Sequence, residues 1–362
     1  PTVEGTLVDA RGIVNRQPFS AASADLTLAG GVLSLEGFEV SAGEAHLAGD
    51  LALSLEGPGL LLAVEGRNVT PEMLRRAGLL WTLPVQGLLS GSLALGRTRD
   101  RLIAEGAAAM GRGRAGGIRV DALEVGLWYL DGEVTLPYVV AARDAATVHA
   151  SGTISRNGGV AIDLATNDVN LRQVARETGL GPWLRGEVDA DGRVSGTLRQ
   201  PVFNGTVAIG RGSVGPLAFD GAEGTVTVTR RGLATPGLIV RDGVGSYFVS
   251  GSARWTGPGF LDLAIDARDI PAAGLARAAD IPLDVTGGVS GRVTVGGTPG
   301  RPSVGGRLTL REARVEGQRV DEVTAAFRWQ GGRLHLDQLQ ARVGDSAVTA
   351  QGTIDRHGPL SL

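Results

Sequence analysis

Apolar and polar residues alternate along much of the chain, and the clearest example is VTAAFRWQGGRLHL at residues 323–336. Val323, Phe327 and Trp329 fall on one face, and the apolar positions resume after the Gly331–Gly332 pair. Alternation of this kind predicts half-buried β-strands, and a glycine pair between two such runs predicts a hairpin turn. The stretch therefore predicts two antiparallel strands with one apolar face that must be covered.

Three sets of residues recur with a period of about a hundred residues. Glycines of the hairpin contexts LAGGVLSL, YLDGEVTL, TRRGLATP and WQGGRLHL lie at Gly31, Gly132, Gly232 and Gly332, with spacings of 101, 100 and 100. A second series is Gly49, Gly152, Gly251 and Gly352, and a third, in helical contexts, is Val69, Val169 and Ile270. Three markers that share one period indicate an internal repeat.

The period divides the chain into four repeats. We expect their boundaries at residues 1–83, 84–183, 184–282 and 283–362, the last one truncated. Each unit should contain roughly six strands and one short helix. In the first repeat Thr70 is a suitable N-cap, Pro71 suits the first helical position, and Gly78 is placed to end the helix.

The glycines of the second series fall on the apolar face of alternating strands such as residues 147–154. Glycine inside a strand commonly marks a bend or a bulge, so we expect each strand layer to fold over there. A one-sided sheet needs a covering layer. Either the sheet bends double and packs into a dry sandwich, or it leaves an apolar trough. The inner positions are mostly Val, Leu, Ala and Gly, with few large aromatics, which favours the trough.

The residues expected to line the trough hold the same hairpin positions in repeats one, two and four. They are Leu26, Leu28, Leu33, Leu35, Leu127, Tyr129, Val134, Leu136, Phe327, Trp329, Leu334 and Leu336. In repeat three, Val226 and Val228 are one residue out of step, which predicts a local bulge or deletion. The same twelve residues would fill the core if the sheet closed into a sandwich.

Composition supports a mainly β fold and excludes several functions. The chain has 57 glycines, only 4% aromatic residues and no cysteine, and its 38 acidic residues nearly balance its 35 basic ones. No basic stripe with interleaved aromatics is present, which disfavours nucleic acid as a partner. The longest apolar stretches are too short to span a bilayer, and targeting signals are expected to lie outside this chain.

Catalytic motifs are weak. Two G-x-G-x-x-G patterns, at Gly111, Gly113 and Gly116 and at Gly210, Gly212 and Gly215, lead into predicted strands and not helices, so we interpret them as a repeating turn. His46, His149 and His335 are expected on the outward, polar face, with no metal-ligand spacing around them. We therefore expect no enzyme activity, no cofactor and no metal.

Two segments carry a family resemblance: VSGTLRQPVFNGTVAIGRGSV at 194–214 and VSGRVTVGGTPGRPSVGGRLTL at 289–310. Their shared signature is Ser195, Gly196, Pro201 and Gly205 in one, and Ser290, Gly291, Pro302 and Gly306 in the other. The pattern resembles the AsmA-like repeats of the TamB family, the inner-membrane subunit of the translocation and assembly module. Repeat two has Ser90 and Gly91 but no proline before Gly106, so it departs from the pattern.

The resemblance implies an elongated, repetitive antiparallel sheet bent into a U-shaped groove, called a β-taco, with one short helix per repeat. It implies a bridge-like lipid-transfer segment in the periplasm of a two-membrane bacterium, anchored in the inner membrane by a helix absent from this chain. The partners it implies are phospholipids and an Omp85-type outer-membrane barrel. The alternative function is a structural or chaperone scaffold for outer-membrane protein assembly with that barrel.

Overall fold

A computed structural model describes residues 2–14, 17–76, 85–178, 184–278 and 284–355 of the chain. The described residues form one long antiparallel sheet of 22 strands, two small sheets of three strands each, and three short helices. The prediction of a mainly β protein is confirmed. By contact, the chain divides into two compact units, residues 1–167 with 194–199, and residues 168–193 with 200–362.

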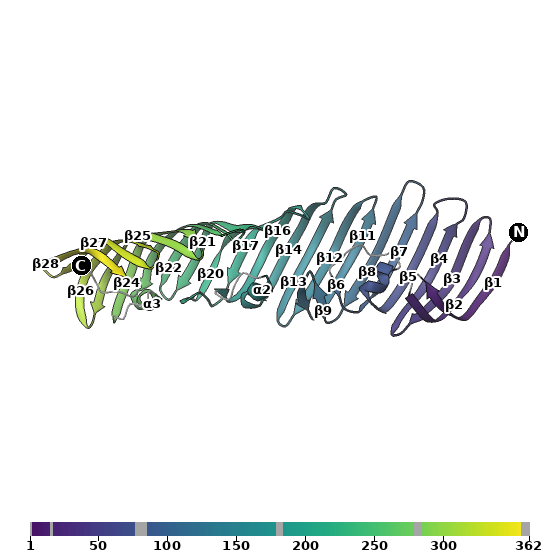
Figure 1. Cartoon of the computed structure of the whole chain (residues 1–362), viewed down its shortest axis with the longest axis horizontal. Helices are drawn as coiled ribbons and strands as arrows, with labels where there is room; N and C mark the ends of the chain where they lie inside the picture. The colour runs from purple at the N-terminus through teal and green to yellow at the C-terminus, as the bar shows by residue number, and fades with distance from the viewer. Residues whose placement is uncertain (1, 15–16, 77–84, 179–183, 279–283, 356–362) are drawn as a thin grey trace. The chain divides into compact units, whose positions relative to one another are not determined.

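In each unit the long strands follow one another in chain order, as Figure 1 shows. The long strands that begin in unit 1 are β1 (Val3–Val14), β2 (Gln17–Ala29), β3 (Val32–Ala42), β4 (Ala45–Ser54), β5 (Leu60–Val69), β7 (Leu89–Arg97), β8 (Leu102–Met110), β11 (Ala122–Leu130), β12 (Glu133–Arg143), β13 (Ala146–Ile154) and β14 (Gly159–Asn170). Those that begin in unit 2 are β16 (Glu187–Thr197), β17 (Pro201–Ile209), β20 (Gly221–Thr229), β21 (Gly232–Asp242), β22 (Gly245–Arg254), β23 (Phe260–Pro271), β24 (Val285–Thr298), β25 (Arg301–Val315), β26 (Gln318–Gln330), β27 (Arg333–Val343) and β28 (Ser346–Asp355). Long strands that are consecutive in the chain pair in antiparallel fashion, and the short strands of the small sheets are skipped, so that β5 pairs with β7 and β17 with β20.

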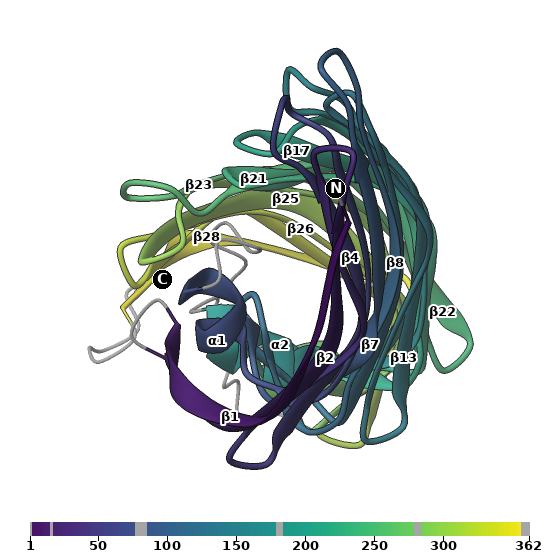
Figure 2. The same cartoon turned by 90° about the vertical axis from the view of Figure 1, so that its right-hand side faces the viewer.

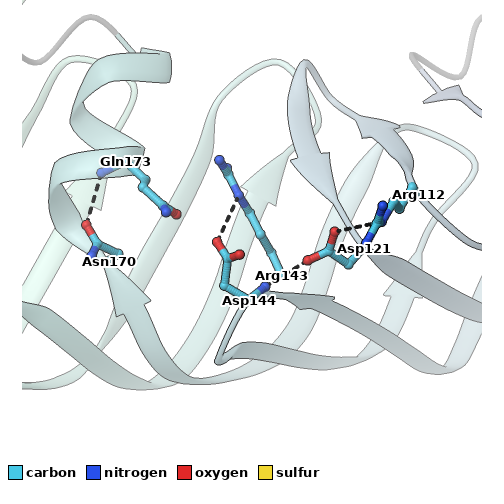
Figure 3. A network of polar contacts seen from close by, with 6 residues as sticks. All are labelled: Arg112, Asp121, Arg143, Asp144, Asn170 and Gln173. Carbon is cyan, nitrogen blue, oxygen red and sulfur yellow. Dashed lines mark hydrogen bonds and ion pairs between the residues drawn. The ribbon is translucent and has the colours of Figure 1, made fainter.

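The three helices are α1 (Pro71–Arg76), α2 (Leu171–Thr178) and α3 (Ala272–Ala278). The Thr70 hydroxyl accepts a hydrogen bond from the Met73 amide at 3.3 Å, so the predicted N-cap and the predicted first helical residue are confirmed. In unit 2, Asn170 caps α2 through the Gln173 amide at 3.2 Å, which Figure 3 shows. Gly78, the predicted end of the first helix, lies outside the described residues.

The small sheets contain the two G-x-G-x-x-G patterns. One consists of β6 (Val85–Gln86), β9 (Gly113–Ala115) and β10 (Ile118–Val120), the other of β15 (Leu184–Arg185), β18 (Gly212–Val214) and β19 (Leu217–Phe219). Gly116 and Gly215 occupy the tight turns of these hairpins with φ of 61° and 58°. Their interpretation as a repeating turn is confirmed.

The hairpin turn of repeat three is placed differently from the other three. The turns of repeats one, two and four are Gly30–Gly31, Asp131–Gly132 and Gly331–Gly332, and all six residues have positive φ. In repeat three Thr229 pairs with Gly232, so the turn is Arg230–Arg231, and Gly232 is the first residue of β21. The identification of Gly232 as a turn glycine was therefore wrong, because the turn lies one residue earlier in the chain than the period of the glycines predicts.

A β-bulge recurs once per repeat in the strand that follows the hairpin turn. The extra residues lie near Gly37 of β3, Pro137 of β12, Gly237 of β21 and Gln338 of β27. The glycines of the second series lie in the next strand, just beyond the bulge. The bulge we expected at those glycines is thus in the neighbouring strand, where two residues oppose one.

The glycines of the second series allow two neighbouring backbones to approach closely. In β4, β13 and β22, a Cβ on Gly49, Gly152 or Gly251 would overlap a carbonyl oxygen of the following strand, those of Ala63, Ala161 and Asp262. Only a residue without a side chain permits so close a backbone approach.

A carboxylate brace ties the small sheets to the next hairpin. In unit 1, Asp121 accepts a hydrogen bond from the Asp144 amide at 2.9 Å and lies 3.8 Å from Arg112, as Figure 3 shows. In unit 2, Asp220 receives the Gly243 amide at 2.9 Å and lies 3.8 Å from Arg211. Asp321 receives the Gly344 amide at 2.7 Å. The brace repeats with the period of the sequence.

Candidate functional site: an apolar face of the sheet

The predicted lining residues face one another across their hairpins. In repeat one Leu26 pairs with Leu35 and Leu28 with Leu33. In repeat four Phe327 pairs with Leu336 and Trp329 with Leu334. In repeat two Tyr129 pairs with Val134, and Leu127 and Leu136 lie on the same face beside the bulge of β12. Each set thus lies on a single face, as alternation predicted.

In unit 1 the strand register joins these pairs into a continuous apolar row. From β2 to β14 the row consists of Leu26, Leu35, Leu51, Leu62, Leu95, Ala104, Tyr129, Val134, Ile154 and Val160. Each member pairs directly with the next. Sequence reasoning found the members in the glycine hairpins and missed the others, because only the ladder shows which residues of other strands continue the row. The missed members are Leu51, Leu62, Leu95, Ala104, Ile154 and Val160.

Unit 2 has an equivalent row: Gly251, Leu263, Val295, Val304, Trp329 and Leu334. Repeat three contributes to the same face. Val228 pairs with Leu233, and Val226 is only 4% exposed. Counted from the true turn at Arg230–Arg231, Val226 and Val228 are in step with the other repeats. The ladder shifts register between Thr225 and Thr227, so a bulge is present as predicted, but the displaced turn is what set these residues out of step in the sequence. The Arg–Arg pair was the signal in the sequence that could have placed the turn.

The most deeply buried residues of the apolar face lie at one end of the strands. There Val69 and Met110 in unit 1 are each 3% exposed, and Ile270 and Ala313 in unit 2 are completely buried. The short elements supply cover, because β10 contacts β12 in unit 1, and α3 contacts β23 and β24 in unit 2. Figure 2 shows α1 to one side of the unit 1 strands β2, β4 and β7.

Away from that end, most of the apolar face is half-buried, although Ala104, Val160 and Val226 are 9%, 7% and 4% exposed. All twelve predicted lining residues are half-buried, and none is fully buried. The main contacts of the long strands are with their ladder neighbours and with the short elements. In a two-layered core, by contrast, large aliphatic side chains are usually buried completely.

The opposite face is polar. His335 pairs with Arg328 across β26 and β27, and its ring nitrogen lies 3.1 Å from the Thr353 hydroxyl. Arg328 donates two hydrogen bonds to Asp337, at 2.9 and 2.6 Å, and these bonds hold the pKa of Asp337 below its ordinary value. His46 and His149 lie on the same polar face in their own strands. The outward placement of these three histidines is confirmed.

One titratable group lies on the apolar face of unit 2. Tyr247 pairs with Val240 and Ala267, and burial, with the nearby charge of Asp242, raises the pKa of its phenol to about 12. In the part of the chain that the structure describes, no three His, Asp or Glu side chains are grouped to hold a metal ion. None of the described helices is long and apolar enough to cross a membrane.

Comparison of the chain with protein-family models, with curated proteins and with solved structures finds no match.

Proposed function

We propose that this chain is a lipid-transfer segment whose apolar face shields the acyl chains of phospholipids. The observation that carries the proposal is the continuous row of each unit, most of whose members are half-buried; Ala104 and Val160 are the buried members in unit 1. Such a row offers an apolar surface that continues from strand to strand. No catalytic group is needed for this function.

The physical gain is the removal of acyl chains from water. Each CH₂ group transferred from water to an apolar surface contributes about 0.8 kcal/mol, so an unshielded acyl chain faces a penalty on the order of 10 kcal/mol. The row is built largely from Leu, Val and Ala, whose contacts are weak one by one and have no direction. A lipid can therefore be held along the row and still move from one strand to the next.

The finer features of the proposal come from the resemblance to the TamB family. The sheet bends into a U-shaped groove with the apolar row inside, and the segment works in the periplasm between the inner and outer membranes. An inner-membrane anchor helix and an Omp85-type barrel at the outer membrane complete the path. The half-buried state of all twelve lining residues supports this arrangement over a dry sandwich.

Lipid extraction and native mass spectrometry of the purified chain test the proposal. We expect phospholipid to copurify with the wild-type chain and to be lost in Leu334→Arg, which places a charge in the row. The matched control is Gln330→Arg, which adds the same charge to an exposed residue of the same hairpin. Absence of lipid from the wild-type chain, or equal lipid in both variants, would overturn the proposal and leave the scaffold for outer-membrane protein assembly.

A further inference from the structure

The polar face of unit 1 carries exposed apolar side chains that the lipid-transfer proposal does not use. Leu61 is 64% exposed, Ile103 49%, Trp128 51% and Leu130 54%. We call these four residues the outer stripe. They alternate with the residues of the inner apolar row, so they lie on the opposite face of the same strands.

The register makes the outer stripe continuous. Leu61 pairs with Gly96, and Gly96 pairs with Ile103 on the next strand. A Cβ on Gly96 would lie 3.6 Å from the Leu61 side chain, so Leu61 extends across the glycine towards Ile103. Ile103 in turn pairs with Leu130. From β5 to β11 the stripe crosses three strand spacings, a length of about 14 Å.

Two open hollows meet at Ile103 and Glu105. One, of about 1100 Å³, includes Trp128 and Leu130 in its lining, and the other, of about 780 Å³, includes Leu61. Contiguous exposed apolar surface of this kind marks sites of interaction in soluble proteins, whereas scattered single residues do not.

The charges beside the stripe select the partner. Acidic residues lie on the same face in the row beside the stripe, two residues along each strand; Glu105, for example, follows Ile103. In this row Asp25 pairs directly with Glu36, and Glu105 pairs with Trp128. Asp50 continues the row on β4. Like charges that face each other across a ladder destabilise a sheet, so this arrangement has a cost. Asp50 accepts a hydrogen bond from the Gly37 amide at 2.8 Å, and none of the ion pairs among the described residues includes Glu36, Asp50 or Glu105.

The same face of unit 2 provides an internal comparison. There three carboxylates are paired with arginine: Arg292 bonds Asp266, Arg328 bonds Asp337 and Arg241 bonds Glu223. Glu36, Asp50 and Glu105 of unit 1 are in none of the ion pairs in the part of the chain that the structure describes. An acidic row without arginine partners beside an apolar stripe is complementary to a surface with apolar and basic residues in adjacent lines.

We infer that the outer stripe of unit 1 docks a basic amphipathic helix of another protein. The apolar side of that helix lies on Leu61, Ile103 and Leu130, with Trp128 as the central aromatic contact. Its arginine or lysine flank faces Glu36, Asp50 and Glu105. An anionic membrane surface is a poor occupant, because the carboxylate row repels it.

The test measures the binding of the full chain to a labelled synthetic helical peptide with a leucine face and an arginine flank. Binding is followed by the fluorescence anisotropy of the peptide. We expect binding that weakens with added salt, and a loss of about tenfold or more in affinity in Trp128→Ala. Glu105→Arg should also weaken binding and should favour a peptide whose flank is glutamate. Val244→Ala, at a 95% exposed position in unit 2, is the control and should bind as the wild-type chain does.

Three outcomes would overturn the inference. They are equal binding of the arginine-flanked and glutamate-flanked peptides, adsorption of the chain to phosphatidylcholine vesicles through Trp128, and concentration-dependent dimers in sedimentation that Trp128→Ala abolishes. Circular dichroism shows whether each variant is folded. If Trp128→Ala does not fold, the test is made with Glu105→Arg. The result is separable from lipid binding, because Trp128→Ala should keep its lipid and Leu334→Arg should keep its affinity for the peptide.

Discussion

Gly152 of β13 lies opposite Ile162 of β14, and a methyl group on Gly152 would overlap the carbonyl oxygen of Ala161. The same relationship holds for Gly49 with Ala63 and for Gly251 with Asp262. The glycines that mark the repeat in the sequence are thus places where two backbones approach too closely for any side chain.

Gly152→Ala is therefore expected to destabilise unit 1. The added methyl group must push β14 away, and alanine rarely adopts the φ of 150° found here, so we expect a loss of about 2–4 kcal/mol in the free energy of unfolding. Denaturant unfolding followed by circular dichroism measures it. Gly111→Ala is the control, since nothing lies within 4 Å of its Cβ position, and it should change stability by less than about 0.5 kcal/mol. Equal stability of the two variants would contradict the close approach.

Asp121→Ala should loosen the hairpin between β12 and β13. The carboxylate of Asp121 accepts a hydrogen bond from the Asp144 amide and lies near Arg112, and alanine has no acceptor, so the loss is expected to cost about 1 kcal/mol. Hydrogen exchange should show faster exchange of the Asp144 amide. Asp100→Ala, in the loop between β7 and β8, provides the comparison and should leave that exchange rate unchanged. A protected Asp144 amide in Asp121→Ala would show that the brace has no role.

Unit 2 should lose stability in acid through Asp337. Its pKa is below the ordinary value in the folded state because Arg328 donates hydrogen bonds to it. Its contribution is thus present above the ordinary carboxyl pKa and is lost as the pH falls through the lowered value. Asp337→Asn should unfold with a weaker pH dependence in this acid range. If the stability of the variant falls with acid pH as steeply as that of the wild-type chain, the Arg328–Asp337 pair does not stabilise the fold.

Unit 2 should also lose stability at high pH, through Tyr247. Because its folded pKa is about 12 and its ordinary value is 10.0, its contribution is complete below pH 10 and is lost as the pH rises towards 12. Ultraviolet titration of the native chain should show one phenol that ionises late, and Tyr247→Phe should remove it. If all phenols of the folded chain titrate together near 10, Tyr247 is not buried as the structure has it.

Repeat three should contact lipid through Val228 and Leu233, which the period of the glycines does not place on the apolar face because it predicts the turn at Gly232. A photoreactive benzoyl-phenylalanine at Val228 or Leu233 should label copurified phospholipid as one at Trp329 does, because all three lie on the apolar face. Thr227 is the control, since it pairs with Ala234 on the opposite face. Labelling from Thr227 equal to that from Val228 would contradict the assignment of the faces.

Much of the site follows from local pattern. Alternation placed Leu26, Leu35, Phe327 and Leu336 on one face, because successive side chains of a strand point to opposite sides. Thr70 and Pro71 predicted the start of α1 for an equally local reason: the exposed amides of a helix start require an acceptor. Neither inference needs knowledge of another strand.

The sequence by itself determined the strands, their period and the apolar face of the hairpins in repeats one, two and four, since these depend on residues close together in the chain. Only the tertiary structure decided the turn at Arg230–Arg231, the bulges near Gly37 and Pro137, and the continuation of the row through Leu51 and Leu95. These features depend on hydrogen bonds between neighbouring strands, and a shift of one residue in a ladder changes the face of every side chain beyond it.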